Sequence, residues 1–370
     1  MVMGVASLTP AFPKIARELN LSETQVAMLI SVFTLPGIFL APLAGILGDR
    51  LGRKMVLVPS LFLFALAGFA CFFSRNIFLL LFFRFIQGIG ASSLGALNMA
   101  LIADFFSGKD RGTAMGYNAS ILSLGTASYP FVGGLLAGMA WYAPFILPLA
   151  AIPVGVALIF YIDEPKIHRT LALTDYLKNA WQSIRQKEVL GLFLISILTF
   201  VVLYGAYLSY FPFLLSQKFQ LSAPQIGIIL SLSSLSTAVT SSQLGKLIHR
   251  FSELTLLKVA FVLYFFVCVL VPNISNLYVL IFPVVLFGIA QGINLPSLQT
   301  LLANLAPENQ RAIFLSMNGM VLRIGQTIGP VFIGLGFAVS GIEGAFYLAG
   351  IIAIFVFISI FVLLGKLKLE

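Results

Sequence analysis

The stretch Gly45-Ile-Leu-Gly-Asp49-Arg50-Leu-Gly52-Arg53-Lys54 decides how this chain folds. It places charged and turn-forming residues between two long apolar runs, one of which ends here while the next begins. A shorter copy, Gly245-Lys-Leu-Ile-His249-Arg250, stands 200 residues later in the same setting. Because one pattern occurs twice at the same place relative to its neighbours, the sequence predicts a duplicated architecture with two related halves.

The composition predicts a membrane protein independently of that stretch. The chain of 370 residues is 59% hydrophobic and 9% charged, and its mean hydropathy is +1.03, whereas soluble domains carry about 25% charged residues. A bilayer core of about 30 Å takes about 20 apolar residues per helix. Helices are expected because lipid offers backbone amides no partner, and the runs do not alternate as barrel strands do. An all-α integral membrane fold follows, with eleven spans near residues 25–47, 55–73, 77–106, 113–139, 143–162, 189–215, 224–245, 254–271, 277–305, 313–339 and 345–365.

The N-terminal segment is apolar but short. As a helix, residues 1–11 reach about 16 Å, which is about half of a bilayer, and residues 12–18 are expected to form an external loop. No basic region precedes the apolar run and no clear cleavage site follows it, which argues against a signal peptide. We therefore expect residues 1–11 to be the second half of a truncated helix 1 in a twelve-helix protein.

The distribution of Lys and Arg predicts the orientation in the membrane. The loops on one side carry 16 of these residues and the loops on the other side carry 4, while Arg84 and Arg323 lie inside spans. Since the side rich in positive charge faces the cytoplasm, we expect a multi-pass protein of the cell inner membrane with a cytoplasmic C-terminus. The net charge of +9 then reflects topology and attraction to lipid headgroups. Charge scattered over short loops gives no support to a nucleic-acid partner.

The first copy of the repeated pattern resembles the G-x-L-x-D-R-x-G-R-K signature between helices 2 and 3 of the major facilitator superfamily of transporters. The halves match further, because Arg84-Phe-Ile-Gln87-Gly88 aligns with Gly288-Ile-Ala-Gln291-Gly292 and five more positions repeat at a spacing of 200. The resemblance implies the major facilitator fold, with two pseudo-symmetric six-helix bundles and a binding site near the membrane midplane. We expect an N-terminal bundle in residues 1–162, a cytoplasmic amphipathic linker in 163–188 and a C-terminal bundle in 189–370.

The resemblance also implies roles for the signature residues, since in related transporters the acid and the second arginine form a latch favouring the outward-open state. Gly45 is expected to allow a close helix approach and Gly52 a tight turn. Asp49 is expected to cap the helix that starts near residues 312–316, and Arg53 to reach Asp104. The alternative is that Arg50, Arg53 and Lys54 are merely topogenic charges. His249 replaces the acid in the second copy, so no matching latch is expected there.

Glycine and proline recur in the fifth and eleventh expected helices. Gly125-Thr-Ala-Ser-Tyr129-Pro130-Phe-Val-Gly133-Gly134 resembles the G-x-x-x-G-P-x-x-G-G motif of drug-exporting facilitators, with Tyr129 in place of a glycine. Helix 11 repeats the core of this motif with Gly325, Gly329 and Pro330. Glycines allow close helix crossing and proline bends a helix, so ordinary helix packing is the alternative.

Two arginines, Arg84 and Arg323, are expected deep inside spans, where charge is costly and usually functional. Arg84 stands in an R-x-x-Q-G sequence that resembles the helix 4 motif linked to proton transfer in related exporters; the alternative for each arginine is an internal hydrogen-bonded strut. No Asp or Glu lies in the middle of any span from 25 to 365, so the coupling acid lies upstream, or coupling uses Arg84 and a charge on the substrate. The proton-coupling or substrate cavity is expected to include Arg84, Gln87, Asn118, Tyr204, Tyr207, Gln291, Asn294, Asn318 and Arg323.

These features predict a transporter rather than an enzyme. The sequence has no Walker-type nucleotide loop, no catalytic triad and no metal-ligand spacing, and no cofactor is expected beyond a proton gradient. The leading hypothesis is a monomeric secondary transporter in the lipid bilayer, most like the bacterial drug:proton antiporters, which exports drugs or other amphipathic small molecules by alternating access. The alternative is a proton-linked or facilitative carrier of an anionic metabolite. A non-transporting receptor on the same fold would be expected to lose the set formed by Asp49, Arg53 and Asp104.

Overall fold

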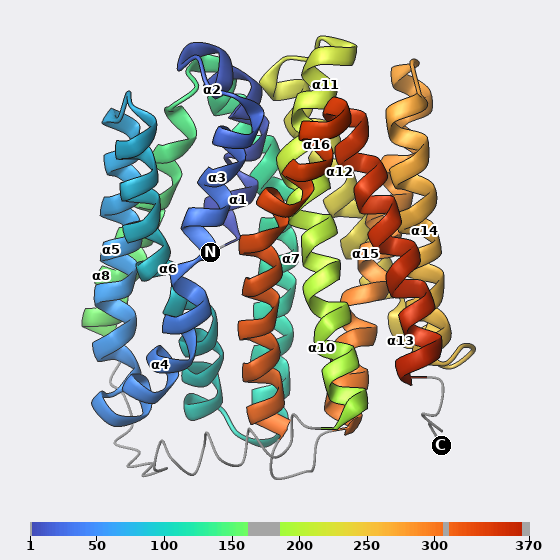
Figure 1. Cartoon of the computed structure of the whole chain (residues 1–370). Coiled ribbons are helices and arrows are strands. Elements are labelled where there is room, and N and C mark those ends of the chain that lie inside the picture. The colour runs from blue at the N-terminus through green and yellow to red at the C-terminus, as the bar shows by residue number, and fades with distance from the viewer. Residues whose placement is uncertain (1, 162–185, 306–310, 365–370) are drawn as a thin grey trace.

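In the computed structural model, which describes residues 2–161, 186–305 and 311–364, the chain forms helices that pack as two bundles (Figure 1). The first half contains α1 (Met3–Ala6), the 3-10 turn η1 (Thr9–Ala11), α2 (Phe12–Glu18), α3 (Glu23–Thr34), α4 (Pro36–Leu51), α5 (Arg53–Phe73), α6 (Ile77–Phe105), α7 (Gly108–Met139), the 3-10 helix η2 (Ala143–Ala150) and α8 (Ala151–Tyr161). The second half contains α10 (Lys187–Phe200), the π-helix η3 (Val201–Tyr210), α11 (Phe211–Phe219), α12 (Ala223–Ser242), α13 (Leu244–Ile248), α14 (Glu253–Asn273), α15 (Leu277–Leu305) and α16 (Arg311–Leu364).

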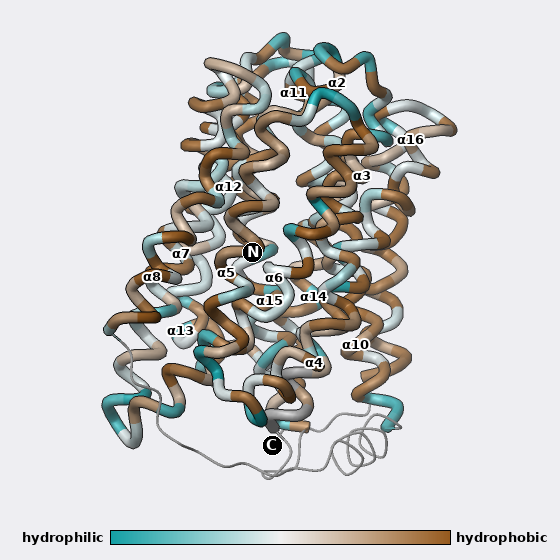
Figure 2. The backbone as a smooth tube through the Cα atoms, turned by 90° about the vertical axis from the view of Figure 1, so that its left-hand side faces the viewer, coloured by the Kyte–Doolittle hydropathy of each residue, from teal (hydrophilic) through white to brown (hydrophobic). Residues whose placement is uncertain are grey.

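The long helices carry the hydrophobic residues that a bilayer requires. Ten stretches of the described chain are long and apolar enough to cross a membrane, and the last of them, Met317–Leu364, bends at Ser340 and Gly341 into two helices. The eleven expected spans, and the all-α fold, are therefore confirmed. Figure 2 shows hydrophobic residues along the helices, with hydrophilic residues concentrated toward the two ends of the molecule.

The two ends of the molecule can be told apart by the position of the signature. The turn between α4 and α5 lies at the end where α8 finishes and α10 begins (Figure 1), and we call this end the signature side. Helices α2 and α11 lie at the other end, which we call the opposite side. The orientation of these two sides relative to the cytoplasm stays a prediction from the charge distribution.

The N-terminal segment is helical over a longer stretch than expected. Helix α1 begins near mid-height of the first bundle, and the segment ends in α2 on the opposite side (Figure 1). The expectation of an external loop at residues 12–18 is wrong. Phe12 and Ile15 lie three residues apart on one helical face and are fully buried, and Pro13 occupies a first-turn position, where a missing N–H is tolerated.

The two halves repeat their helix caps as well as their signature. A reciprocal Ser–Gln capping box, in which each side chain bonds to the other residue's backbone N–H, begins both α3 and α12. An Asn side chain accepts a backbone N–H at the start of both α6 and α15. These residues are spaced by 200: Ser22 and Ser222, Gln25 and Gln225, Asn76 and Asn276. The duplication thus extends to the polar residues that set where corresponding spans begin.

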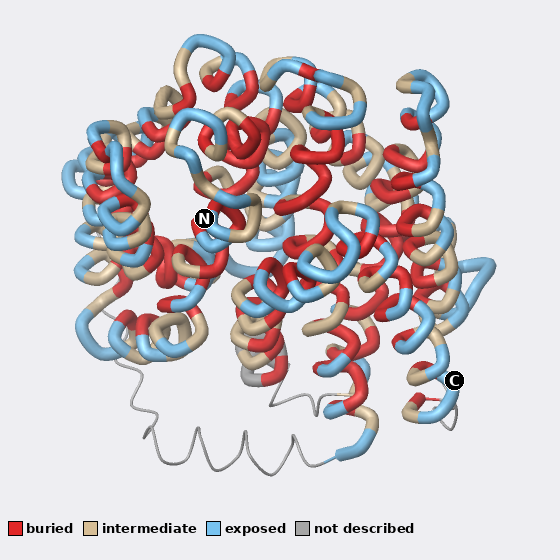
Figure 3. The backbone as a smooth tube through the Cα atoms, turned by 45° about the horizontal axis from the view of Figure 1, so that its top comes forward, coloured by how far each residue is buried: buried red, intermediate tan, exposed pale blue. Residues whose placement is uncertain are grey.

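Each half has its own hydrophobic core, and buried residues lie on the inward faces of the helices (Figure 3). Phe200, Tyr204 and Phe213 of the second half pack with the core of the first half, so the two cores meet. The amphipathic linker expected at residues 163–188 falls outside the described residues except for its end, where Lys187 begins α10. The domain limits at 1–162 and 189–370 stay predictions.

The interface between the bundles is closed on the opposite side and open on the signature side. Helices α7 and α12 cross where Gly134 faces Gly227, and the buried residues of α7 all lie between Pro130 and Ala137. The buried residues of α12 likewise lie in its first half, between Ile226 and Ser233. Both helices are exposed or half-buried toward the signature side. In this conformation, the surfaces at which the bundles face each other are accessible from the signature side.

Candidate functional site

The signature folds as the turn between α4 and α5. Helix α4 ends at Leu51, α5 begins at Arg53, and Gly52 between them has φ 102°. This backbone conformation is in the region where a side chain is strained and glycine is not. The tight turn expected at Gly52 is therefore present, and it places the acid and the second arginine on adjoining helix ends.

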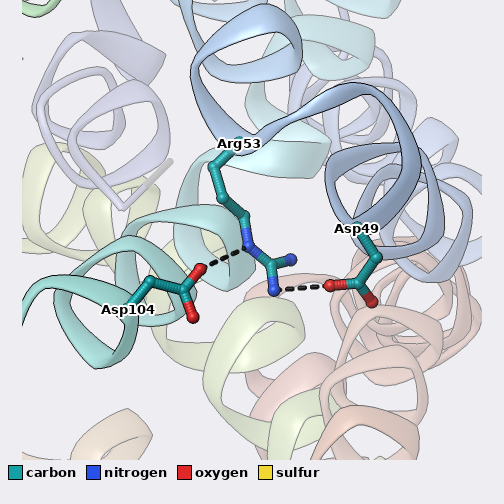
Figure 4. Close-up of polar contacts among 3 residues, drawn as sticks. All are labelled: Asp49, Arg53 and Asp104. Atoms are coloured by element: carbon teal, nitrogen blue, oxygen red, sulfur yellow. Dashed lines mark hydrogen bonds and ion pairs between the residues drawn. The ribbon is translucent and has the colours of Figure 1, made fainter. Parts of the chain in front are cut away.

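Asp49, Arg53 and Asp104 form one ion-pair network on the signature side (Figure 4). Arg53 Nη2 lies 2.5 Å from Asp49 Oδ1, and Arg53 Nε donates to Asp104 Oδ2 at 3.2 Å. Arg53 and the Asp104 side chain are each 7% exposed, whereas the Asp49 side chain is 35% exposed. Charge-assisted bonds between buried groups are strong and directional. The expected contact of Arg53 with Asp104 is thus made, and the network joins α4, α5 and α6 within the first bundle.

The expected contact of Asp49 with the start of the eleventh helix is not seen. In the described part of the chain, the Asp49 carboxylate pairs with Arg53 alone. Residues 306–310, which precede that helix, lie outside the described residues. The side chains of residues 311–313, 315 and 316 are also outside the described part, so this contact stays a prediction.

The close helix approach expected at Gly45 is not seen among the described residues. A Cβ added at Gly45 would have no atom within 4 Å, whereas a Cβ at Gly48 would lie 2.5 Å from Leu97 Cδ2 of α6. Gly48 therefore packs against α6, whereas Gly45, about one turn earlier in α4, has room for a side chain. Of the remaining signature cations, Arg50 is exposed, and Lys54 Nζ donates to the Ile159 carbonyl at 2.8 Å, which ties α5 to α8.

The second copy of the signature lacks a matching network. It lies at α13, where Gly245 has no neighbour within 4 Å. Among the described residues, the ion pairs found within 4.0 Å are the two at Arg53, and neither involves His249 or Arg250. The polar signature is therefore asymmetric between the halves in the described structure, as the loss of the acid led us to expect.

Arg84 lies in the interior of the first bundle rather than at the interface. It is 1% exposed, and it donates from Nε to the Leu29 carbonyl at 3.1 Å and from Nη1 to the Gly4 carbonyl at 2.9 Å. Nη1 also lies 2.8 Å from Gln87 Oε1, and the guanidinium stands 4.2 Å from the centre of the Phe33 ring. The geometry is that of an internal strut joining α1, α3 and α6, which was the alternative considered for this residue.

The corresponding residues of the second half also point into their own bundle. The Tyr264 hydroxyl donates to Gln291 Oε1, and Asn294 Nδ2 donates to Thr199 Oγ1 at 3.2 Å. The Tyr207 ring stacks on Phe287, with ring centres 4.0 Å apart. These partners belong to α10, η3, α14 and α15. Gln291, Asn294 and Tyr207 thus form a neutral polar interior, so they do not line the interface as the expected cavity required.

Of the other expected cavity residues, Arg323 and Tyr204 contact the first bundle from the second, while Asn118 bonds within its own bundle. Arg323 contacts both α4 and α6 of the first bundle, and Tyr204 packs with the core of that bundle. Asn118 accepts a hydrogen bond from Asn98 Nδ2 at 2.8 Å, joining α7 to α6. Asn318 is 3% exposed, and its Oδ1 has no partner among the described residues. Arg323 is the charged member of this group.

The glycines of the two motif-bearing helices pack at helix crossings, with one exception. A Cβ at Gly133 or Gly134 would strike the backbone of Ser7 or Ala223, and one at Gly325 would strike the Ile197 carbonyl. Gly329 lies against Gly205 of η3, and the Pro130 carbonyl faces Gly227. Gly125 contacts Tyr129 of its own helix. The Tyr210 hydroxyl lies 3.4 Å from the Pro330 carbonyl.

A family model described as the Major Facilitator Superfamily matches residues 1–222 and 207–368. The chain belongs to the major facilitator superfamily. It is therefore a transporter, not an enzyme, and a multi-pass membrane protein whose partners are the lipid bilayer and a small-molecule substrate. Two solved facilitators share the fold. A variant of the nucleoside transporter NupG is 14% identical with a TM-score of 0.83, and the match covers 98% of this chain and 96% of that chain. A human organic anion transporter is 20% identical with a TM-score of 0.71, and the match covers 97% of this chain and 96% of that chain.

Several curated relatives of this facilitator are bacterial. Multidrug resistance protein 2 of Bacillus subtilis is 26% identical over 363 residues, covering 95% of this chain and 89% of the relative. The Bacillibactin exporter of the same organism is 26% identical over 350 residues, covering 89% and 85%. The Quinolone resistance protein NorA of Staphylococcus aureus is 25% identical over 357 residues, covering 94% and 89%. These relatives are distant, and their substrates are considered for this facilitator only as a proposal.

Sequence reasoning missed the polar contacts that join the two bundles of this facilitator. Gln217 Nε2 lies 2.9 Å from Glu23 Oε1 on the opposite side, and nearer the middle the hydroxyls of Thr34 and Thr327 are 2.9 Å apart. The Tyr210 hydroxyl lies 3.5 Å from Thr24 Oγ1. Glu23 follows a capping serine, which is a signal for a helix start at the membrane surface. Nothing in the sequence says which residue of the other half it meets.

Proposed function

We propose that this facilitator exports amphipathic small molecules in exchange for protons, by alternating access between its two bundles. The observation that carries the proposal is the one-sided interface, closed between Gly134 and Gly227 and accessible from the signature side. A molecule entering from the signature side would meet both bundles. The names of the multidrug, bacillibactin and quinolone relatives support export as the direction and amphipathic compounds as the cargo.

The signature side is assigned to the cytoplasm in this proposal. The loops and ends on that side carry 16 of the Lys and Arg residues against 4 on the opposite side, and positive loops stay in the cytoplasm. An exporter loads its cargo from the cytoplasm, so a conformation open to the signature side is the loading state. The C-terminus then also lies in the cytoplasm.

The network of Asp49, Arg53 and Asp104 acts as the latch in this proposal. In the loading state the two described ion pairs lie within the first bundle, and the Asp49 side chain is 35% exposed. When the signature side closes, Asp49 can approach the start of the eleventh helix, where free backbone N–H groups and the helix dipole favour a negative charge. The latch thus stabilises the state that releases cargo outward.

Transport by the purified protein in proteoliposomes tests the proposed function. Vesicles with an imposed proton gradient are loaded with a panel of cationic dyes and amphipathic organic anions, and their efflux is followed with and without a proton uncoupler. We expect uncoupler-sensitive movement of at least one class against its gradient. Movement of no compound, or movement that the uncoupler leaves unchanged, would contradict proton-coupled export.

A second candidate function is a proton-linked or facilitative carrier for an anionic metabolite. The observation that favours it is that Arg84 and Arg323 are both buried and that, within the described residues, neither pairs with a carboxylate. The same panel separates the candidates. Uptake of small polar anions with no effect on amphipathic dyes would favour the carrier.

A further inference from the structure

Arg323 is a buried cation that bridges the two bundles. It belongs to α16 of the second half, at about 18 Å along that helix from Arg311, which is near the middle of a hydrocarbon core of about 30 Å. Its residue surface is 9% exposed. A charge at this depth is costly to retain without a function, so its contacts decide what it does.

The contacts of Arg323 with the first bundle are few and partly steric. Nη2 donates to the Ser92 carbonyl of α6 at 3.1 Å, the one hydrogen bond of this side chain among the described residues. The guanidinium also lies directly against Gly37 of α4, where an added Cβ would overlap Nη1. The absence of a side chain at Gly37 therefore makes room for the cation between α4 and α6.

The donors of Arg323 are under-used and its charge is not neutralised. A guanidinium has five N–H donors in a planar fork, and here one neutral carbonyl accepts from it. The ion pairs of the described residues do not include Arg323. Several buried side-chain atoms of the described chain have no hydrogen-bond partner, and none of them belongs to Arg323. The unused N–H groups of Arg323 are therefore partly accessible. Arg84, by contrast, is held by three acceptors.

We propose that Arg323 binds a carboxylate of the transported molecule, so that the cargo of this protein is an amphipathic anion or zwitterion. This inference rests on the proposed function, which supplies the existence of a cargo, and it specifies the charge of that cargo. A carboxylate accepts two N–H groups of the fork at once, which a backbone carbonyl cannot do in the same geometry. Asn318 of the same helix, whose Oδ1 has no partner among the described residues, is neutral and carries no charge that would compete with the carboxylate.

Binding at Arg323 also explains how cargo could shift the bundles. The bond from Arg323 to Ser92 links the second half to the first. A carboxylate that takes over these donors replaces a neutral acceptor with a charged one and releases Ser92. A ligand shifts a conformational equilibrium when it interacts differently with the two states, and loss of this link is such a difference.

The test is a matched pair of ligands, a xanthene dye with a free carboxylate and its methyl ester, measured by fluorescence polarisation on the purified full-length protein. We expect the acid to bind more tightly than the ester. Arg323→Gln should weaken binding of the acid by about tenfold or more, and should change binding of the ester by less than about twofold. Arg323→Lys should recover part of the affinity for the acid, because an ammonium keeps the charge but lacks the fork.

The control is Arg75→Gln, which removes one positive charge from an exposed residue on the opposite side and should leave the acid-to-ester ratio unchanged. Size-exclusion profiles and melting temperatures establish that each variant is folded. Gly37→Ala gives a second route to the same answer if Arg323→Gln fails to fold, because it displaces the guanidinium while keeping the charge. It should also weaken the acid selectively.

Three results would overturn the proposal: equal binding of acid and ester to the unaltered protein, an equal loss of both in Arg323→Gln and Gly37→Ala, or no binding of either dye. Failure of the proposed function gives a different result. If the acid binds in an Arg323-dependent way but no compound is exported from proteoliposomes, the anion site stands and the export function does not.

Discussion

The two ends of the bundle interface differ in how they are built. On the opposite side, backbones meet at Gly134 and Gly227, and Gln217 bonds to Glu23 across the bundles. On the signature side, the charged groups of Asp49, Arg53 and Asp104 bond within one bundle. One end is closed by small residues and a few hydrogen bonds, while the described ion pairs of the other end lie within the first bundle.

The two kinds of contact respond differently when the bundles move. Close packing at glycines is favourable only when the backbones approach, and it is lost as soon as they separate. Ion pairs within one bundle survive either state, and they can also exchange partners when the other bundle approaches. In the proposed cycle, the opposite side would therefore alternate between packed and separated states, while the signature network would exchange partners.

The largest effect is expected for Gly227→Leu. The added side chain would strike the Pro130 carbonyl and the Gly134 backbone, and overpacking of this kind costs about 1–3 kcal/mol. We expect the opposite side to be unable to close and proton-driven dye transport to fall by about tenfold or more. The control is Gly245→Leu in α13, where nothing lies within 4 Å. A loss of thermal stability in Gly245→Leu equal to that in Gly227→Leu would remove the distinction between the ends.

A loss of about tenfold in transport rate is expected for Asp49→Asn. The substitution keeps the size of the side chain but removes the charge that pairs with Arg53 at 2.5 Å, and bonds to charged groups contribute about 1.5–3 kcal/mol. Membrane insertion and expression should be unchanged, which is checked by fractionation of membranes. Unchanged transport in proteoliposomes would refute the latch.

A smaller effect separates two glycines of the signature. Gly48→Ala introduces a Cβ 2.5 Å from Leu97 Cδ2 and should lower the melting temperature. Gly45→Ala meets no atom within 4 Å and should raise stability by about 0.5–1 kcal/mol, since alanine is the better helix former. Differential scanning fluorimetry of the two variants in detergent measures both. If Gly45→Ala is the more damaging change, the signature side is packed in a way that differs from this account.

The smallest effect is expected for Gln217→Ala. It removes one exposed hydrogen bond to Glu23, which contributes about 0.5–1.5 kcal/mol at most. The closed end should remain closed through its glycine contacts, and the transport rate should change by less than about threefold. A loss as large as that of Gly227→Leu would mean that polar contacts, rather than backbone packing, hold the opposite side.

Much of the fold could be predicted because long apolar helices are the direct consequence of placing backbone in lipid. The spans and the duplicated signature follow from hydropathy and spacing, and the contact of Arg53 with Asp104 follows from the resemblance to related transporters. The three charged residues of 12–18 favour a loop, whereas the structure has a helix there with Phe12 and Ile15 buried. Burial of these two side chains against the bundle decides the matter, and it depends on tertiary contacts that the sequence does not state.

The candidate site was harder to predict than the fold. In a membrane bundle, the interior of each half and the interface between halves are both apolar with a few polar groups, so hydropathy does not distinguish them. The sequence therefore gives the same prediction, a polar residue inside a span, for Arg84, Gln291 and Arg323. Their hydrogen-bond partners distinguish their positions. Arg84 bonds to Leu29 and Gly4, and Gln291 to Tyr264, each within its own bundle. Arg323 bonds to Ser92 of the other bundle.

Distances between spin labels show whether the two ends of the interface open and close in opposition, as the proposed alternating access requires. Cys71 and Cys268, both buried and unpaired, are first replaced by alanine. One label pair is placed on exposed sites of the closed end, Leu135 and Ile228, and another toward the signature side, Ser120 and Val239. When an imposed proton gradient drives the cycle, we predict that the signature-side distance shortens while the opposite-side distance lengthens. Two distances that stay fixed, or that change in the same direction, would contradict the account.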